Sequence, residues 1–511
     1  MFKLVDMSAR RAAWRGFGSG VTAGLVLVAA MYGASAILGI SPLPSLLQEP
    51  LLAFMPGFVF GFLIDTLQHA GKVIEEAGLV VAMVAGLGVL GGAWGWASHR
   101  WHQPRWAMGF AAAGWLVVAV VLLPFTGDGI LGLNEGLTAP LTWALLFAVY
   151  GVVLQLGGDP ASERAPEPDR LADPDRRRML RWLPLGIGAL SFGALALELG
   201  PRWYRAVFTP PGSGLSGISP EITPIPDFYV VSKNLVGDPV VVEQGWRLSL
   251  GGLVDTPLHL TLSDLRGMPS TSEYVTLECI SNLVGGPQMS TGKFTGVRLR
   301  ELIAMAGPQS KATDVGYKAV DGYSETLPLS LINGAPEILV AYALDDQPLP
   351  TAHGFPARIL IPGHYGMKGP KWLQSIDLAD HAEGGYWEQQ GWDRNAVVKT
   401  TARIDVPSDS AVLKVGSITV AGVAFAGTRG IQAVEYSTDG GKSWAQADFK
   451  QPLSELTWVT WQTTWSPHSE GSYTLQVRAT DGTGSQQDPT KAMSYPSGAS
   501  GYHTVRVDVS K

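Results

Sequence analysis

Six stretches without a charged side chain lie in the first 200 residues, and they most restrict what this chain can fold into. They cover 16–40, 51–64, 78–97, 107–125, 141–157 and 183–197. Most approach the roughly 20 apolar residues that an α-helix needs to cross a bilayer, where backbone polar groups must be paired within the helix. Residues 1–200 are therefore predicted to form a multi-helix transmembrane region.

The second of these stretches is the least suited to cross a membrane. It is short, follows Pro42, Pro44 and Pro50, contains Pro56 and ends before Asp65. Proline removes a helical hydrogen bond and kinks or ends a helix. We therefore expect five spans and one re-entrant or tilted segment, with six spans as the alternative.

Basic residues indicate the orientation of the spans, because cytoplasmic loops are enriched in Lys and Arg. They gather in three loops, at Lys3, Arg10, Arg11, Arg15, Arg100, Arg105, Arg164, Arg170, Arg176, Arg177, Arg178 and Arg181. With five spans all three groups are cytoplasmic, and everything after residue 200 lies outside. Six spans would place either the basic N-terminus or both other loops outside, so five are preferred.

The sequence Asp175–Arg181, which reads DRRRMLR, resembles the twin-arginine export signal. That signal directs folded, cofactor-loaded domains across a membrane. The alternative is a basic anchor that keeps its loop in the cytoplasm. Both interpretations predict a multi-pass protein of the cell membrane whose C-terminal part is extracytoplasmic.

A linker rich in Gly, Pro and Ser, at 201–220, precedes two domains of soluble character. Short strands and helices alternate over 221–398 and predict an α+β domain; one helix is expected at 261–266 with Ser263 as its N-cap. Over 399–511, regularly spaced strands with Asp-Gly turns are typical of an immunoglobulin-like β-sandwich. The sandwich has no titratable cluster suited to catalysis, so we expect it to serve packing or association.

Cys279 is the only cysteine, and it lies between a β-favouring run and the turn-forming residues Asn282, Gly285, Gly286 and Pro287. One cysteine cannot form an internal disulfide. Any chemistry at Cys279 is therefore that of a thiolate, as a nucleophile or a metal ligand. The alternative is a small buried hydrophobic residue.

The segment 353–372 is dense in Gly, Pro and basic residues. Glycines let backbone amides approach a ligand closely, and Arg and Lys bind phosphate well. The segment therefore predicts a phosphate-binding loop, with a basic surface loop as the alternative.

Together, the motif 277–282 and the segment 353–372 resemble the sulfite oxidase family of molybdenum enzymes. The resemblance covers 228–511 and implies a molybdopterin-binding domain followed by that family's immunoglobulin-like dimerisation domain. It implies that Cys279 ligates molybdenum beside two dithiolene sulfurs of one pterin, as suits a soft thiolate. It also implies cofactor contacts at Val231, Ser232, Lys233, Asn234, Leu235, Asp321, His353, Arg358, Gly369, Pro370 and Lys371.

The substrate pocket departs from the family pattern at three places. Lys233 replaces an arginine of sulfite oxidases, Leu283 and Val284 stand where they have another basic residue, and Trp392 replaces a tyrosine near the metal. Lysine lacks the planar fork with which arginine binds oxyanions, which argues against sulfite as the substrate. Cys279, Lys233 and Trp392 are the predicted catalytic residues.

The resemblance implies two-electron oxygen-atom transfer on a small sulfur- or nitrogen-containing substrate, in either direction. Haem is not expected, because His69, His99 and His102 are the only histidines of the membrane region and lie near the ends of apolar stretches. Electrons would be exchanged with a separate cytochrome or quinone. A homodimer through the C-terminal domain is a candidate, and no nucleic-acid partner is expected.

Two other functions are compatible with the residues themselves. One is a cysteine nucleophile, for example in acyl transfer, which needs a histidine base that the local sequence does not supply. The other is a membrane-tethered, non-catalytic interaction protein that uses its β-sandwich. Molybdenum near one atom per chain would fit only the oxidoreductase.

Overall fold

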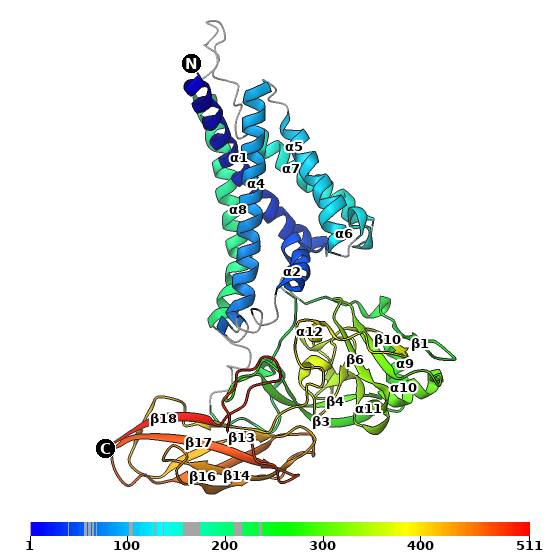
Figure 1. Ribbon diagram of the computed structural model, residues 1–511, viewed down its shortest axis with the longest axis vertical. Coiled ribbons are helices and arrows are strands. Elements are labelled where there is room, and N and C mark those ends of the chain that lie inside the picture. The colour runs from blue at the N-terminus through cyan, green and yellow to red at the C-terminus, as the bar shows by residue number, and fades with distance from the viewer. Residues whose placement is uncertain are drawn as a thin grey trace. The chain divides into compact units, whose positions relative to one another are not determined.

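The computed structural model of the 511-residue chain divides into two compact units (Figure 1). The first contains Met1–Met55 and His69–Phe208, and the second contains Pro56–Gln68 and Thr209–Lys511. The structure describes residues 2–38, 40–55, 59, 63, 66–67, 69–101, 106–126, 129–135, 137–156, 174–208, 217–234 and 238–511. Each unit has its own hydrophobic core.

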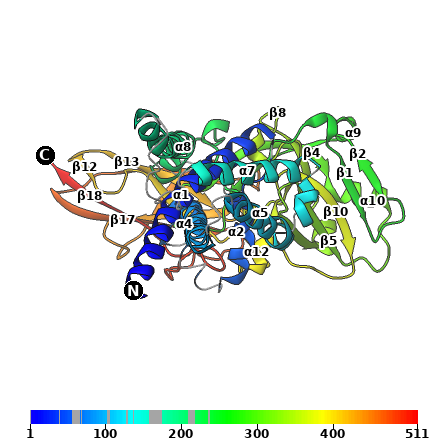
Figure 2. The same cartoon turned by 90° about the horizontal axis from the view of Figure 1, so that it is seen from above.

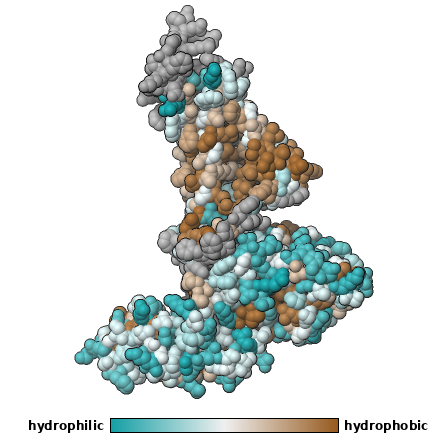
Figure 3. All heavy atoms as spheres, viewed as in Figure 1, coloured by the Kyte–Doolittle hydropathy of each residue, from teal (hydrophilic) through white to brown (hydrophobic). Residues whose placement is uncertain are grey.

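The first unit is built of helices (Figures 1 and 2). They are α1 (Phe2–Leu38), α2 (Leu43–Phe54), α4 (His69–Trp101), α5 (Ala107–Val117), the π-helical η2 (Val118–Leu122), α6 (Leu123–Phe125), η3 (Ile130–Glu135), α7 (Thr138–Leu156) and α8 (Pro174–Phe208). In the described part of the chain, four segments are long and apolar enough to cross a membrane: Ser8–Leu38, Val73–Trp101, Ala107–Phe125 and Thr138–Leu156. Apolar residues are prominent on the surface of this unit in Figure 3, as a lipid-facing surface requires.

These helices confirm the predicted apolar helical region, with differences in detail. The last apolar stretch forms a shorter run, Gly186–Pro201, within α8. Helix α2 has 12 residues and contains Pro50, so it extends about 18 Å, less than the ~30 Å of a bilayer core. Several later residues of the second apolar stretch lie outside the described ones. The number of spans and their orientation stay predictions.

Glycines bring the backbones of α1 and α4 into contact. A Cβ at Gly16 would lie 2.3 Å from the Gly91 carbonyl oxygen, and a Cβ at Gly91 would lie 2.6 Å from Gly20 Cα. A Cβ at Gly95 would lie 2.4 Å from the Ala12 carbonyl oxygen. Apolar side chains gain little by leaving lipid, so close packing of this kind is a main source of helix association in membranes.

A buried carboxylate joins three of the helices. Glu76 of α4 accepts hydrogen bonds from the Tyr32 hydroxyl of α1 at 3.0 Å and from the Trp203 indole of α8 at 2.7 Å. The Tyr150 hydroxyl of α7 donates to the Leu87 carbonyl of α4 at 2.8 Å. A buried polar group without a partner is costly, so these bonds favour one arrangement of the helices.

Two sheets form the domain that precedes residue 400. The first has the order β2-β1-β10-β5-β6, with β1 (Leu248–Gly252), β2 (Leu258–Leu260), β5 (Asp314–Ala319), β6 (Ser324–Pro328) and β10 (Leu373–Ala379). The second has the order β3-β4-β7-β8, with β9 paired to β7: β3 (Thr271–Glu278), β4 (Met289–Arg298), β7 (Leu339–Leu344), β8 (Gln347–Pro348) and β9 (Arg358–Leu360). Short helices connect the strands: η4 (Ile225–Asp227), η5 (Glu243–Gly245), α9 (Leu262–Gly267), α10 (Leu299–Ala306), α11 (Leu329–Gly334), η6 (Thr351–His353), η7 (Gly366–Lys368) and α12 (Tyr386–Gln389). The predicted α+β fold is confirmed.

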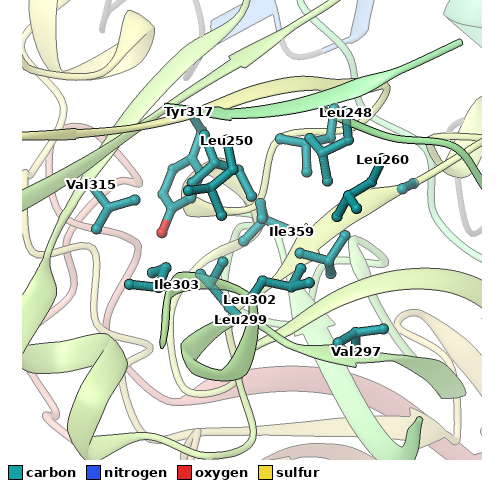
Figure 4. Packing of buried hydrophobic residues seen from close by; sticks show 14 of the residues in the cluster. Leu248, Leu250, Leu260, Val297, Leu299, Leu302, Ile303, Val315, Tyr317 and Ile359 are labelled. Carbon is teal, nitrogen blue, oxygen red and sulfur yellow. The ribbon is translucent and has the colours of Figure 1, made fainter. Parts of the chain in front are cut away.

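The core of this domain packs α10 against the sheets (Figure 4). Leu299, Leu302 and Ile303 recur at helical spacing and are buried together with Leu250 of β1 and Ile359 of β9. This core holds β9, whose first residue is Arg358, in a fixed position.

The start of α9 corrects one expectation. Thr261, not Ser263, is the N-cap: its hydroxyl accepts from the Asp264 N–H at 3.0 Å, and the Asp264 carboxylate accepts from the Thr261 N–H at 2.8 Å. The prediction of Ser263 was wrong because the helix begins at Leu262, one residue after a threonine that completes a reciprocal capping box.

The C-terminal domain is a β-sandwich formed by one curled sheet, as expected. Its order is β11-β13-β16-β15-β14-β17-β18-β12, with β11 (Thr401–Val406), β12 (Ala411–Lys414), β13 (Ile418–Phe425), β14 (Ile431–Ser437), β15 (Ala445–Phe449), β16 (Val459–Trp465), β17 (Gly471–Asp481) and β18 (His503–Ser510). Strand β15 pairs with both β14 and β16 and so joins the two layers. Trp461, Leu475 and Val505 belong to the core between them.

Candidate functional site

Cys279 lies where β3 ends and a loop begins that returns to β4. Its N–H donates to the Gln288 carbonyl at 3.0 Å, which closes the loop at its base. The Asn282 side chain braces the loop, donating to Glu278 at 3.0 Å and accepting from the Gln288 N–H at 3.0 Å. The sulfur is partly buried and lies 3.1 Å from the Ser281 hydroxyl. The thiol thus lies on a braced turn, which argues against a purely apolar packing role.

The tip of this loop is held by the immunoglobulin-like domain. Arg403 of β11 donates from Nη1 to the Gly286 carbonyl at 2.8 Å. The same guanidinium pairs with Asp405 at 2.6 Å and donates to the Ser219 hydroxyl at 2.8 Å. Since all of its donor nitrogens have partners, Arg403 fixes the loop tip relative to the sandwich.

A histidine completes this contact. His503 accepts from the Ile404 N–H at 3.0 Å, and its ring fills the place where a Cβ of residue 285 would lie, 2.1 Å from Cδ2. Gly285 also has φ of +79°, so only glycine suits this turn. Sequence reasoning missed Arg403 and His503, because nothing local signals that two strands over 100 residues downstream reach this loop.

Arg358 is a buried cation at the start of β9. Its Nη1 and Nη2 lie 3.4 Å and 3.3 Å from the carbonyl oxygens of His353 and Gly369. Burial lowers the pKa of Arg358 to about 10, and no carboxylate of the described residues lies within ion-pairing distance. A desolvated cation is costly without an anion, so the position suits a bound phosphate.

His353 and Lys371 lie beside this guanidinium. The His353 ring packs edge-on against Phe228, with centroids 5.2 Å apart. Burial, and then the charges of Arg358 and Lys371, lower the pKa of His353 to about 4, so the imidazole is neutral at pH 7. Lys371 donates to the Ala352 carbonyl at 2.8 Å. The structure thus brings together three of the residues predicted to bind the cofactor.

We call the segment around Arg358, His353 and Lys371 the cofactor cradle. Two glycines let its backbone pack closely. A Cβ at Gly369 would lie 2.6 Å from the Ile359 carbonyl oxygen, and the next residue, Pro370, accepts from the Ile359 N–H at 3.0 Å. Gly354 has φ of +107°, and a Cβ there would lie 2.9 Å from Lys371 Cβ. Contacts within the protein thus require glycine at both positions. The expectation that glycines also let a ligand approach this segment stays a prediction.

Asp321 gathers residues from three segments. Its carboxyl is hydrogen-bonded to the Asn234 side chain and interacts with Lys233 and Lys371. Burial raises the pKa of Asp321, while Lys233 and the hydrogen bonds oppose that rise. The Lys233 ammonium lies 5.2 Å from the centre of the Tyr386 ring. The structure thus brings Lys233 and Asn234 of the 231–235 loop together with Asp321, and their contacts with a cofactor stay predictions.

The rest of that loop is more open. Val231 is 36% exposed, and Ser232 is partly buried. Leu235 lies outside the described residues. Cofactor contacts of Val231, Ser232 and Leu235 stay predictions.

Three buried tyrosines surround Cys279, and sequence reasoning did not select them. Burial raises the pKa values of Tyr229, Tyr323 and Tyr365, and the charge of Cys279 raises each further. The Tyr323 hydroxyl donates to the Met367 carbonyl at 2.5 Å. Phenols with such raised pKa values keep their protons at neutral pH and can act as hydrogen-bond donors. Tyr323 could have been selected from the sequence, because it follows Asp321, a predicted cofactor contact, by two residues.

Trp392 lies on a cavity of about 280 Å³. The cavity is also lined by Gly384, Glu388, Gln389 and Arg394. The Trp392 ring packs edge-on against Tyr495 at 5.2 Å, and its indole nitrogen is buried without a hydrogen-bond partner in the described structure. The prediction that Trp392 replaces a tyrosine near the metal stays a prediction. The charge of Cys279 does act on the phenol of another residue, Tyr323.

These residues fit a cofactor that brings most of its own ligands. Among the described residues, no group of three or more His, Cys, Asp or Glu side chains could hold a metal ion. Cys279 can supply one thiolate, and the same domain offers the positive charges of Arg358 and Lys371 beside the neutral His353 ring. The charges of Cys279 and Arg358 both act on Tyr229, which lies in the same domain. A pterin that contributes sulfur ligands and a phosphate matches this donor set.

Comparison with known proteins supports the same conclusion. Residues 236–387 match the oxidoreductase molybdopterin binding domain, and residues 401–477 match a bacterial Ig domain. The chain is 28% identical over 287 residues to the mitochondrial sulfite oxidase of Mus musculus, covering 47% of this chain and 52% of that protein. It is also 28% identical over 291 residues to the sulfite oxidase of Arabidopsis thaliana, covering 73% of that protein.

A solved structure has the same fold. The sulfane dehydrogenase SoxCD of Paracoccus pantotrophus aligns with 57% of this chain and 82% of its own, with a TM-score of 0.51 and 22% identity. The chain spans about half the length of the mammalian relatives it matches. Residues 236–387 therefore form a molybdopterin-binding oxidoreductase domain, and over that domain and the one that follows, the chain is similar to sulfite oxidases.

Proposed function

We propose that this chain is a membrane-anchored molybdenum enzyme that transfers an oxygen atom to or from a small sulfur- or nitrogen-containing substrate. One observation carries the proposal: a single partly buried thiol ends β3 in the domain where Arg358 is buried without a carboxylate partner among the described residues. Cys279 would be the protein ligand, and Arg358, His353 and Lys371 would hold the pterin and its phosphate. When bound, molybdenum supplies two-electron oxygen-atom transfer.

The residues around Cys279 would orient the substrate. Tyr323 keeps its proton, because burial and then the Glu325 and Asp321 charges hold its pKa well above the usual value. On substrate binding, its hydroxyl would turn from the Met367 carbonyl, to which it donates in this structure, to the oxygen that is transferred. Lys233 would add a positive charge on the side of Asp321. These two side chains position a polar end of the substrate without requiring a dianion.

The same residues predict which substrates are preferred. Lys233, Leu283, Val284 and Trp392 replace groups that in sulfite oxidases bind a dianion. A pocket with fewer fixed positive charges and more apolar surface favours a neutral or monoanionic, partly apolar substrate. We therefore expect neutral S-oxides or N-oxides to react better than sulfite.

The membrane anchor and electron partner are part of the proposal. Four apolar helices support anchoring, and the distribution of Lys and Arg in the sequence supports an extracytoplasmic catalytic domain. Electrons would pass to or from a cytochrome or a quinone rather than through haem of this chain. The C-terminal domain would provide the contact of a homodimer.

Metal analysis of the purified chain tests the proposal. Wild type is expected to contain about one molybdenum per chain, because each chain supplies one thiolate, at Cys279. Arg358→Gln removes the cation of the cradle and should lower pterin content. Arg298→Gln is the matched control, because Arg298 is 34% exposed and lies near Glu301 at 3.9 Å. Wild type without molybdenum, or equal pterin loss in both variants, would refute the proposal.

A further inference from the structure

A lysine buried between two carboxylates lies beside the proposed cofactor cradle but is not part of it. Lys368 of η7 donates from Nζ to Glu325 of β6 and to Glu388 of α12, both at 2.6 Å. The side chains of Lys368, Glu325 and Glu388 are only 1%, 0% and 7% exposed. Three separate elements thus meet in one short, charge-assisted chain of hydrogen bonds.

The charges of this triad place one proton on Glu325. Burial raises the pKa of Glu325 to about 8, although Lys368 opposes the rise. Burial acts on Glu388 too, but hydrogen bonds from Lys368, then from Glu325 and last from Arg394 bring its pKa below the usual value. At pH 7 the triad therefore holds a protonated Glu325, an ammonium and a carboxylate, with no net charge.

Other titratable groups also face Glu325. Tyr317 of β5 is its cross-strand partner, and the Glu325 charge contributes to the raised pKa of Tyr317 after burial. Tyr323 is influenced in the same way, and Arg394 faces the triad through Glu388, at 3.1 Å. Both tyrosines keep their protons, so Glu325 is the group of this set that changes charge near neutral pH.

A purely structural role does not account for the triad. Replacing buried ion pairs by apolar residues is often neutral or stabilising. In addition, Glu325 and Glu388 share a hydrogen bond, which requires one of the two carboxyl groups to be protonated. Two carboxyl groups that share a proton can pass it from one to the other.

The triad has an outer end at solvent. Glu388 and Gly384 line the cavity of about 280 Å³ that also contains Arg394. The Glu325 carboxyl packs against the backbone of Gly385, which follows Gly384: a Cβ at Gly385 would lie 2.5 Å from Glu325 Oε1. Water in this cavity can therefore exchange protons with Glu388.

The triad also has an inner end toward the proposed metal ligand. Tyr323 is influenced by the charges of both Glu325 and Cys279. Its hydroxyl donates to the carbonyl of Met367, the residue that precedes Lys368. Tyr323 thus contacts the backbone next to Lys368 and lies near enough to the thiol for its charge to act on the phenol.

We propose that Glu325, Lys368 and Glu388 form the route by which protons pass between the catalytic pocket and the cavity at Gly384 and Arg394. The inference rests on the proposed function. Oxidation of a lone-pair donor by water gives the oxide, two protons and two electrons. The electrons leave through a one-electron carrier, and the two protons leave through this route, one per pass; reduction of an oxide reverses both flows.

One pass moves one proton from the catalytic pocket to the cavity. Glu325 gives its proton to the Glu388 carboxylate through the hydrogen bond that the two share, and Glu388 then releases a proton to water in the cavity. The Glu325 carboxylate takes the proton released in the pocket, while the Lys368 ammonium stays charged between the two carboxyl groups. The triad then returns to its starting state, with one proton moved outward.

The test uses the holoprotein with dimethyl sulfoxide and reduced benzyl viologen, and with sulfite and ferricyanide for the oxidising direction. Glu325→Gln and Lys368→Met should lower kcat at least tenfold with unchanged KM and molybdenum content. The dependence of kcat on pH near 8 should be lost in Glu325→Gln, and the solvent deuterium isotope effect should rise. Lys293→Met is the matched control, since Lys293 forms a partly exposed pair with Asp346 at 2.8 Å.

If Glu325→Gln or Lys368→Met fails to fold, Glu388→Gln still tests the route. It should show the same loss of kcat, and added formate should restore turnover by carrying protons through the cavity, which a structural defect would not allow. Wild-type kcat and pH profile in Glu388→Gln with full molybdenum content would overturn the route. Wild type without molybdenum or turnover would instead refute the proposed function.

Discussion

Arg403→Ala should loosen the loop that carries Cys279 although it changes a residue of the other domain. Arg403 and Asp405 are 12% and 7% exposed and lie 2.6 Å apart. Removing one partner of a buried pair costs about 3–5 kcal/mol, because the other charge stays buried. At roughly 2 °C per kcal/mol for a unit of this size, the melting temperature should fall by about 6–10 °C. The Gly286 carbonyl and the Ser219 hydroxyl also lose their donors.

Two measurements on the full-length, cofactor-free protein check this. Thermal unfolding reports the stability, and the rate at which Cys279, the only thiol, reacts with a chromogenic disulfide reports the loop. A loss of about 1.4 kcal/mol in loop closure should raise that rate about tenfold. Arg478→Ala is the matched control, because Arg478 pairs with Glu435 at 2.9 Å and lies over the Trp444 ring at 4.1 Å.

The control should lose about 1–2 kcal/mol, from a partly exposed pair and a cation–π contact, and leave the thiol rate unchanged. Equal thiol rates in Arg403→Ala and wild type would refute the reasoning, whatever the change in melting temperature. That result would mean that β3 and β4 alone hold the loop.

Three further predictions follow from particular residues. Cys279→Ser should retain the fold, with an unfolding midpoint close to wild type, but lose molybdenum, because a hydroxyl is a poor substitute for a soft thiolate; retained metal would contradict the assignment. Stability should fall as pH rises from about 5 to about 8, since the raised pKa of Glu325 means that the native state binds a proton that the unfolded chain has lost; Glu325→Gln should flatten this slope in urea titrations. Gly91→Val should weaken the α1–α4 contact by about 1–3 kcal/mol in detergent unfolding, whereas Gly86→Val, with nothing within 4 Å of its Cβ, should not.

Sequence patterns predicted the elements better than the contacts between them. Alternating residues, Asp-Gly turns and charge-free stretches are local signals, and they correctly indicated apolar helices, an α+β domain and a β-sandwich. The cap of α9 shows the limit of such signals. Thr261 and Ser263 are both good caps, and only the start of the helix at Leu262 decides between them.

Some residues of the candidate site could likewise be predicted from the sequence, and others could not. Cys279, His353 and Arg358 belong to short motifs, so their resemblance to a family could be recognised from the sequence. Lys368 lies in the same basic segment but could not be distinguished from a phosphate ligand, since its partners Glu325 and Glu388 are 43 and 20 residues away. Burial and partners, which decide what a charged residue does, depend on the folded chain.

The contact of Arg403 and His503 with the loop at Gly285 and Gly286 also sets an order of events during folding. His503 begins β18, which follows every other strand of both domains along the chain, so the support of the turn that carries Cys279 is incomplete until the sandwich has formed. Under the proposed function, the cofactor would then be inserted after the C-terminal domain has folded rather than while the chain is being made.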